Sequence, residues 1–206
     1  MKKDKKEYKI TRRIVKFILW LLVMLVYRVK KVGEENIPDG EGVIICANHV
    51  HALDAAAIVL CTKKQICFMA KKELFKNPCL RWLAKIFEIF PVDRNAKDIE
   101  AIKNSMKVLK AKKILGVFPE GTRNGLKKNV KPKSGAIHIA AKSGAKVVPL
   151  TVKGSFKPFT KVTLIYGKPI DYSYLNADKQ NKEALDKATI ELMETIEKPL
   201  MVNMKK

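Results

Sequence analysis

A histidine and an aspartate five residues apart are the part of this sequence best suited to chemistry. His49 and Asp54 lie in the stretch NHVHALD, between the apolar runs Gly42–Ala47 and Ala55–Leu60. A carboxylate beside an imidazole fixes the tautomer of the ring and stabilises the imidazolium, so that the ring can take a proton from a substrate. The pair is therefore a candidate general base with its support, and it suits a hydroxyl or an amine substrate.

A covalent acyl-enzyme has no obvious nucleophile in this chain. The sequence has no G-x-S-x-G motif, and its four cysteines lie among apolar neighbours without C-x-x-C spacing, as is typical of reduced core thiols in a cytosolic compartment. Direct attack by a deprotonated substrate hydroxyl is the simpler expectation. Zinc bound by His51 and a second histidine is the alternative, but only His138 is left as a third imidazole, so we expect no metal site.

Two further polar clusters each follow an apolar run. Asp93 and Arg94 form one cluster, and Glu120, Gly121 and Arg123 form the other. Guanidinium groups match phosphate oxygens, and a glycine lets the backbone approach a ligand closely. A base beside phosphate-binding groups points to an acceptor with both a hydroxyl and a phosphate. Each arginine can also be interpreted as an ordinary surface cation, and the Lys-rich stretch 127–133 as a solvated loop or as a phosphate or membrane contact.

The elements that must position these clusters alternate between strands and helices. Apolar runs predict strands over 43–47, 65–70, 114–118, 146–152 and 162–167. Helical spacing predicts helices over 53–61, 71–87 with a break at Pro78, 98–111, 134–142 and 179–204. This alternation predicts an α/β fold with a mostly parallel central sheet flanked by helices. Ligands bind at the carboxyl ends of such strands, so we expect the three clusters at one edge of the sheet.

The N-terminal region, residues 1–31, differs from the main domain that we expect over residues 32–206. Its first half is basic and amphipathic, and Phe17–Tyr27 contains only apolar and aromatic residues. An eleven-residue helix spans about 16 Å, whereas the hydrocarbon core of a bilayer is about 30 Å thick. We therefore expect a membrane-associating helix that dips into one leaflet. A helix that packs on the core of a soluble domain is the alternative.

The composition predicts a folded domain with an anionic partner. The 206 residues are 47% hydrophobic, and 42 Lys and Arg against 20 Asp and Glu give a net charge of +22. That hydrophobic fraction excludes a disordered chain. An anionic membrane surface fits both the charge and the apolar helix. We expect no nucleic acid partner, because the cations lack interleaved aromatics and no DNA-reading motif is present.

Four blocks of the sequence resemble the glycerolipid acyltransferases of the 1-acyl-glycerol-3-phosphate acyltransferase type. The stretch from Asn48 to Asp54 is similar to the N-H-x4-D block of that family, and residues 89–94 are similar to its block ending in V-D-R. Residues 118–123 read F-P-E-G-T-R, and residues 147–150 are similar to the V-P-hydrophobic block. The resemblance covers roughly residues 33–170, and the first and third blocks in order are its most specific part.

The resemblance implies an enzyme that moves a fatty acyl group from a thioester donor, acyl-CoA or acyl carrier protein, to the 2-hydroxyl of 1-acyl-glycerol-3-phosphate, giving phosphatidate. His49 would be the general base and Asp54 its support, without a covalent acyl-enzyme. The phosphate pocket for this lysophospholipid acceptor is implied at Arg94, Glu120, Gly121 and Arg123. No cofactor is implied beyond the donor as co-substrate, and the expected location is the cytoplasmic face of the cell membrane.

Three positions depart from the family pattern. His51 stands where many members have Ser, Glu88 where Gly is frequent, and Asn124 where Ser is frequent. None of these changes removes a catalytic group, but they bear on the choice of acceptor and on the local backbone. Two other functions stay open from the sequence: an acyltransferase for another lysophospholipid, and a non-catalytic basic module that binds membrane or nucleic acid.

Overall fold

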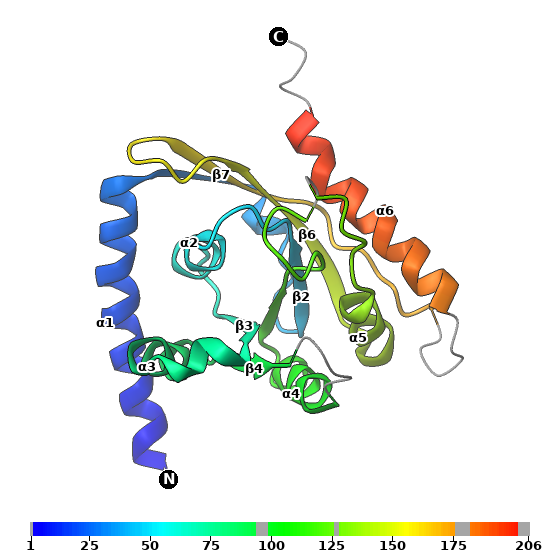
Figure 1. Cartoon of the computed structure of the whole chain (residues 1–206). Helices are drawn as coiled ribbons and strands as arrows, with labels where there is room; N and C mark the ends of the chain where they lie inside the picture. Colours follow the sequence, from blue (N-terminus) through cyan, green and yellow to red (C-terminus); the bar gives the residue numbers. More distant parts are fainter. Residues whose placement is uncertain (1, 94–98, 126–127, 176–181, 202–206) are drawn as a thin grey trace.

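A central β-sheet organises the molecule. In the computed structural model, residues 2–93, 99–125, 128–175 and 182–201 are described, and they form a seven-stranded sheet of order β1-β7-β6-β2-β5-β3-β4 (Figure 1). The strands are β1 (Arg28–Val32), β2 (Val43–Ala47), β3 (Ile66–Lys71), β4 (Phe90–Val92), β5 (Ile114–Val117), β6 (Lys146–Gly154) and β7 (Lys161–Tyr166). Neighbouring strands run parallel except for the antiparallel pair β6 and β7. The predicted mostly parallel sheet is confirmed.

Helices cover both faces of the sheet. They are α1 (Lys2–Val26), α2 (Asp54–Cys61), α3 (Pro78–Phe87), α4 (Ile99–Lys110), α5 (Gly135–Ser143) and α6 (Lys182–Met201), with the short 3-10 helices η1 (Glu34–Asn36) and η2 (Lys72–Lys76). The first three α-helices pack on one face and the last three on the other (Figure 1). Strand β2 supplies Val43 and Ile45 to one core and Ile44 and Cys46 to the other, as expected for a parallel strand buried on both faces.

Strand β1 is an element that the sequence patterns do not predict. Its residues, RVKKV, lack an apolar run and alternate between exposed and half-buried. They pair with β7 at the edge of the sheet, where backbone hydrogen bonds hold a strand whose exposed side chains include Arg28 and Lys30. The predicted limit between residues 31 and 32 falls inside this strand, and the division of the chain at that point stays a prediction.

Helix α1 packs lengthwise on the domain. Val15, Leu19 and Val23 contact the core under α2 and α3. The Arg12 guanidinium donates to the Ile86 carbonyl at 2.9 Å, and the Lys16 ammonium donates to the Thr62 carbonyl at 2.7 Å. One face of the helix is therefore fixed to the domain by both apolar and polar contacts.

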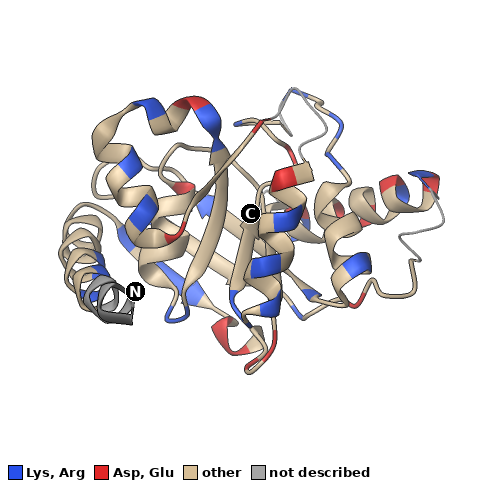
Figure 2. Cartoon of the chain, turned by 90° about the horizontal axis from the view of Figure 1, so that it is seen from below, with Lys and Arg blue, Asp and Glu red and all other residues tan. Residues whose placement is uncertain are grey.

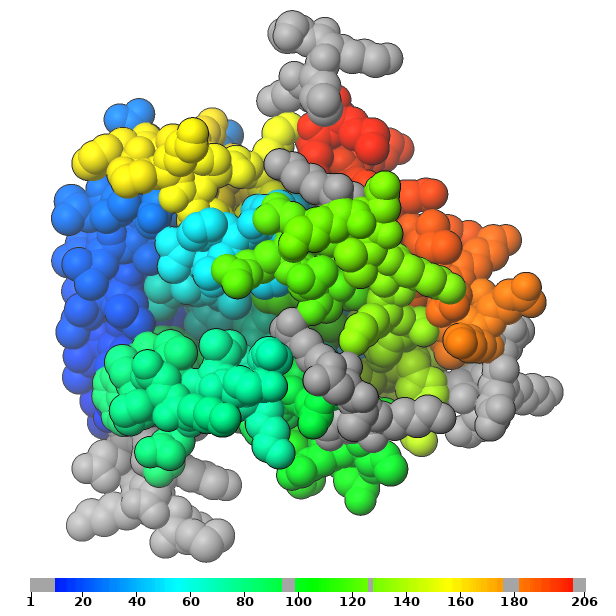
Figure 3. Space-filling view, viewed as in Figure 1, coloured from blue at the N-terminus to red at the C-terminus, as the bar shows by residue number. Residues whose placement is uncertain are grey.

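The opposite face of α1 is apolar and exposed. It consists of Ile10, Ile14, Phe17, Ile18, Leu21, Leu22 and Leu25. The helix forms a column along one side of the molecule (Figure 3). Among the described residues, no helix combines the length and the apolar character needed to cross a bilayer.

Glu88 shows how a departure from the family pattern is accommodated. It ends α3 with a φ of 55°, in the left-handed region that favours glycine. Its carboxylate accepts a hydrogen bond from Arg12 at 3.0 Å and pairs with Lys113. These contacts join α1, α3 and the start of β5. Glu88 therefore adopts the left-handed turn that a glycine would favour and adds a polar junction that a glycine could not provide.

Basic residues are distributed over helices, strands and loops rather than gathered on one element (Figure 2). Together with the exposed apolar face of α1, this distribution gives the molecule a surface that is cationic in many places and apolar along one side.

Candidate active site

Three polar clusters follow the carboxyl ends of parallel strands at one edge of the sheet. Strand β2 leads to Asn48 and His49, β5 leads to Phe118 and the turn after it, and β4 leads to Asp93. Strands β2 and β5 are direct neighbours, and the segments that follow them lie against each other on one face of the molecule (Figure 3). Arg94, which belongs to the third cluster, lies outside the described residues.

His49 and Asp54 are in direct contact. The Nδ1 atom of His49 lies 2.8 Å from Oδ2 of Asp54. The same oxygen accepts the backbone N–H groups of Val50 and His51 at 2.7 and 2.8 Å. Asp54 is fully buried and is the first residue of α2, where the helix dipole favours a carboxylate. With Nδ1–H donating to Asp54, the neutral ring carries its lone pair on Nε2 and can accept a proton there.

The backbone of His49 is held from both sides by the turn after β5. Its N–H donates to Oε1 of Glu120 at 2.6 Å, and its carbonyl accepts the N–H of Asn124 at 2.6 Å. Asn124 has a φ of 56°, a conformation that asparagine tolerates better than most residues, so the departure from Ser at this position fits the turn. Next to His49, the buried side chain of Asn48 exchanges two hydrogen bonds with the backbone of Val152.

The ring of Phe118 stacks on the imidazole of His49. The two centroids are 4.2 Å apart and the planes differ by 16°. Phe68 in turn stacks on Phe118, with the two ring centroids 5.2 Å apart. Sequence analysis assigned no role to Phe118, although its position directly after β5 is a signal that it lies at the functional edge.

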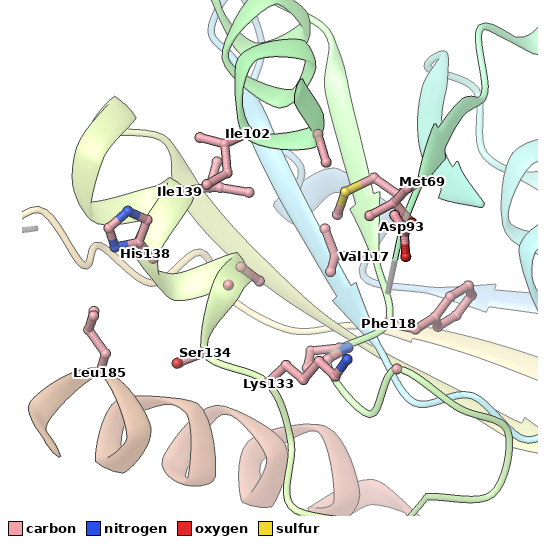
Figure 4. Close-up of a pocket in the computed structure, with 16 residues that line it drawn as sticks. Met69, Asp93, Ile102, Val117, Phe118, Lys133, Ser134, His138, Ile139 and Leu185 are labelled. Carbon is pink, nitrogen blue, oxygen red and sulfur yellow. The ribbon is translucent and has the colours of Figure 1, made fainter. Parts of the chain in front are cut away.

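Two cavities meet beside Phe118. The smaller cavity, of about 290 Å³, lies among α1, α2 and α3 and is apolar, with Leu19, Val59 and Leu83 in its wall. The larger cavity, of about 530 Å³, lies on the other side of the sheet edge among β4, β5, α4 and α5 (Figure 4). Phe118 and Met69 line both cavities. The ring that stacks on the candidate base therefore stands between an apolar compartment and a larger, partly polar one.

Comparison with known proteins decides the family. A sequence profile of the family described as Acyltransferase matches residues 28–153. The chain belongs to the acyltransferase family. This acyltransferase is 34% identical over 182 residues to the 1-acyl-sn-glycerol-3-phosphate acyltransferase of Bacillus subtilis. The aligned region covers 84% of this chain and 89% of that protein. It is 31% identical over 198 residues to the protein of the same name from Streptococcus pneumoniae, over 89% of this chain and 72% of that protein.

A solved structure shares the fold of the acyltransferase. The crystal structure of the 1-acyl-sn-glycerophosphate acyltransferase PlsC from Thermotoga maritima matches with a TM-score of 0.74 and 26% identity, over 100% of this chain and 85% of that chain. The resemblance found in the four sequence blocks is thus confirmed, and the protein is an enzyme rather than a non-catalytic basic module.

The four residues proposed from the sequence for the acceptor's phosphate lie in different surroundings in the acyltransferase. Gly121 lines the larger cavity and has a φ of 64°. Arg123 is exposed on the same turn. Glu120 is buried, and its carboxylate accepts the backbone N–H of His49. Arg94 lies outside the described residues, and a phosphate contact of any of these residues stays a prediction.

The other two histidines of the acyltransferase lie apart from the His49–Asp54 pair. The exposed ring of His51 stacks on Phe156, with centroids 5.0 Å apart, and Phe156 in turn contacts Tyr27 at the end of α1. His138 lies on α5 at the far side of the larger cavity (Figure 4). In the described ranges, no three metal-ligating side chains are gathered in one place.

The cysteines are placed as mostly buried thiols. Cys46, Cys61 and Cys67 are buried, while Cys79 on α3 is exposed, contrary to the expectation that all four lie in the core. Burial raises the pKa of Cys46 to about 12, so this thiol, two residues before Asn48, stays protonated at neutral pH.

Proposed function

We propose that this acyltransferase moves a fatty acyl group from acyl-CoA or acyl carrier protein to the 2-hydroxyl of 1-acyl-glycerol-3-phosphate, giving phosphatidate for phospholipid biosynthesis. The names of the relatives from Bacillus subtilis and Streptococcus pneumoniae support this acceptor. The observation that carries the mechanism is the contact of 2.8 Å between His49 and Asp54, with the ring of His49 stacked on Phe118, a residue that lines two cavities.

The proposed reaction is a direct acyl transfer with His49 as general base. Nε2 of His49 takes the proton of the 2-hydroxyl, and the negative charge of Asp54 stabilises the imidazolium. The hydroxyl oxygen attacks the thioester carbonyl, a C–O bond forms, and the C–S bond breaks. The departing thiolate then takes the proton from the imidazolium, so the base is regenerated without a covalent intermediate or a cofactor.

The two cavities suit the two ends of a lysophospholipid reaction. An apolar cavity of about 290 Å³ is suited to an acyl chain, because burial of each CH₂ group is worth about 0.8 kcal/mol. The larger cavity includes Gly121 and polar side chains and is suited to the glycerol phosphate. With Phe118 common to both, the reacting hydroxyl and the thioester carbonyl would meet beside His49.

We further propose that the enzyme works at the cytoplasmic face of the cell membrane, with the exposed apolar face of α1 in one leaflet. A helix docked on the domain with its other face apolar has the form of an interfacial anchor. The net charge of +22 favours an anionic membrane surface. Nucleic acid is not part of this proposal.

The proposal is tested with purified protein, a matrix of donors and acceptors, and mass spectrometry of the lipid product. Lysophosphatidate, lysophospholipids with a headgroup and 1-acylglycerol are each offered with acyl-CoA and with acyl carrier protein. We expect phosphatidate as the main product. Preference for a lysophospholipid with a headgroup, or no acyl transfer to lysophosphatidate, would show that the acceptor is wrong.

The role of His49 is tested by comparing His49→Ala with His51→Ala. Loss of the base should lower kcat by about 10²–10⁴, while His51→Ala, with an exposed ring stacked on Phe156, should keep most of the activity. Thermal unfolding checks that both variants fold. A His49→Ala enzyme with unchanged kcat contradicts the mechanism.

A further inference from the structure

Lys133 lies at the larger cavity, next to the turn that follows β5. Its backbone N–H donates to the carbonyl of Pro119 at 2.8 Å, which fixes the residue against that turn. Its side chain passes over Gly121: a methyl group on Gly121 would stand 3.4 Å from Cε and 3.9 Å from Nζ of Lys133. The aliphatic stem and the ammonium therefore lie beside the space that a side chain at position 121 would occupy.

The cavity around this ammonium is otherwise largely apolar. Met69, Ile102, Val117 and Ile139 form much of its wall (Figure 4). A volume of about 530 Å³ is within the usual range of about 300–1,000 Å³ for small-molecule sites. A cation beside apolar walls attracts an anion more strongly than the same cation in bulk water, because the local dielectric constant is lower.

The cavity has an anionic side as well. Asp93 at the end of β4 lines it, and its carboxylate repels an anion. A phosphate in this cavity is therefore expected beside Gly121 and Lys133 and away from Asp93. That place is also close to the base, since Phe118 lines the cavity and its ring is 4.2 Å from the imidazole of His49.

We propose that Lys133 binds the phosphate monoester of the acceptor and favours it over acceptors whose phosphate carries a headgroup or is absent. This inference rests on the proposed function and adds a residue that the sequence motifs left in an unassigned Lys-rich loop. A monoester carries up to two negative charges and three free oxygens near neutral pH, whereas a phosphodiester carries one charge. An ammonium at one fixed position gains more from the monoester.

The chain offers a matched control in the same loop. Lys131 is two residues away, is exposed, and pairs with Asp186 on α6 at 2.7 Å. The test compares Lys133→Ala, Lys133→Met and Lys133→Arg with Lys131→Ala. The methionine variant keeps an unbranched stem over Gly121 without the charge, and the arginine variant keeps the charge.

We expect Lys133→Ala and Lys133→Met to raise the KM for lysophosphatidate by about 10- to 100-fold, as for loss of a charge-assisted hydrogen bond. The donor KM and the KM for 1-acylglycerol should stay near the wild-type values, Lys133→Arg should recover most of the loss, and Lys131→Ala should behave as wild type. A second measurement needs no acyl transfer: glycerol 3-phosphate should raise the Tm of the wild type and of Lys131→Ala but not that of Lys133→Met.

Three outcomes would overturn the inference. They are an unchanged acceptor KM in Lys133→Met, an equal loss with 1-acylglycerol, and a rise in the donor KM alone. Failure of the proposed function looks different, because the wild type would then transfer no acyl group to lysophosphatidate. If the wild type transferred no acyl group but its Tm shift by glycerol 3-phosphate still depended on Lys133, the results would support the phosphate site and contradict the proposed reaction.

Discussion

Asp54 holds three donors with a single oxygen. Oδ2 accepts from the ring of His49 and from the backbone N–H groups of Val50 and His51. The carboxylate thus shapes the loop, and in the proposed mechanism it also supplies the charge that stabilises the imidazolium; substitution can separate these two roles. Asp54→Asn keeps an oxygen for the donors but has no charge, whereas Asp54→Ala removes the oxygen as well.

We expect both Asp54 variants to lose about 10²–10⁴ in kcat, because the imidazolium is no longer stabilised. Only Asp54→Ala should also lower the free energy of unfolding, by about 1–2 kcal/mol, since it leaves the partly buried N–H groups of Val50 and His51 without an acceptor. Steady-state kinetics and urea unfolding measure the two effects. An Asp54→Asn enzyme with nearly full kcat would show that the charge is not required.

At the residue scale, the sequence predicts the pairs that depend on spacing and misses those that depend on backbone groups. His49 and Asp54 could be paired because a strand end and the first turn of a helix bring residues five apart together. The phosphate contact expected of Glu120 stays a prediction, while the hydrogen bond that its carboxylate accepts from the N–H of His49 is one that spacing does not reveal, because every residue except proline carries this donor. Phe118 contacts His49 only because β5 lies beside β2, and pairing order is not visible in a single sequence.

At the scale of elements, the junction at the end of α3 determines how α1 is held. Burial alone would raise the pKa of the Glu88 carboxyl, but the hydrogen bond from Lys113 and the charges of Lys113 and Arg12 outweigh burial and lower it. A carboxyl pKa below its ordinary value of 4.5 means that the ionised form is favoured in the folded state. The ionised Glu88 carboxylate therefore stabilises the folded state above about pH 4.5, and this stabilisation is lost as the pH falls through the lowered pKa.

We therefore expect Glu88→Gln to lower the free energy of unfolding at pH 7 by roughly 1 kcal/mol or less, since the side chain is partly exposed. The difference from wild type should shrink as the pH falls below about 4.5. Hydrogen exchange should become faster in α1, which Arg12 ties to this junction. Glu73→Gln, in an exposed pair with Lys71, is the control. Equal pH dependence in wild type and Glu88→Gln would contradict this account.

The elements themselves were largely predictable. Buried strands and amphipathic helices have apolar periodicity that local sequence reveals, and β2, β5 and α5 lie within two residues of their expected limits. The sequence does not predict edge strand β1, because three of its five side chains are Lys or Arg and the strand has no apolar run. The antiparallel pairing of β6 with β7 is not predictable from apolar spacing, because that spacing does not show which strands become neighbours in the sheet.

At the scale of the whole molecule, an apolar helix face and a strongly cationic domain should act together on a membrane. The exposed face of α1 provides apolar area, and each Lys or Arg near an anionic surface adds about 1 kcal/mol. Binding to vesicles should therefore require anionic lipid and weaken as salt is raised from about 0.1 M to 1 M, because the Debye length falls from about 10 Å to 3 Å.

The contribution of the helix face is tested with the double variant Phe17→Ser and Leu21→Ser. Both side chains are more than half exposed, so the free energy of unfolding should change little while binding to anionic vesicles falls by about tenfold or more. Met201→Ser, at the exposed end of α6 on the other face of the sheet, is the matched control and should bind as wild type. Vesicle co-sedimentation at several salt concentrations, with short-chain soluble lysophosphatidate assayed in parallel, separates anchoring from catalysis. If the double variant binds vesicles normally, the membrane contact lies elsewhere on the cationic surface; if it loses activity on the soluble acceptor as well, α1 supports the site itself.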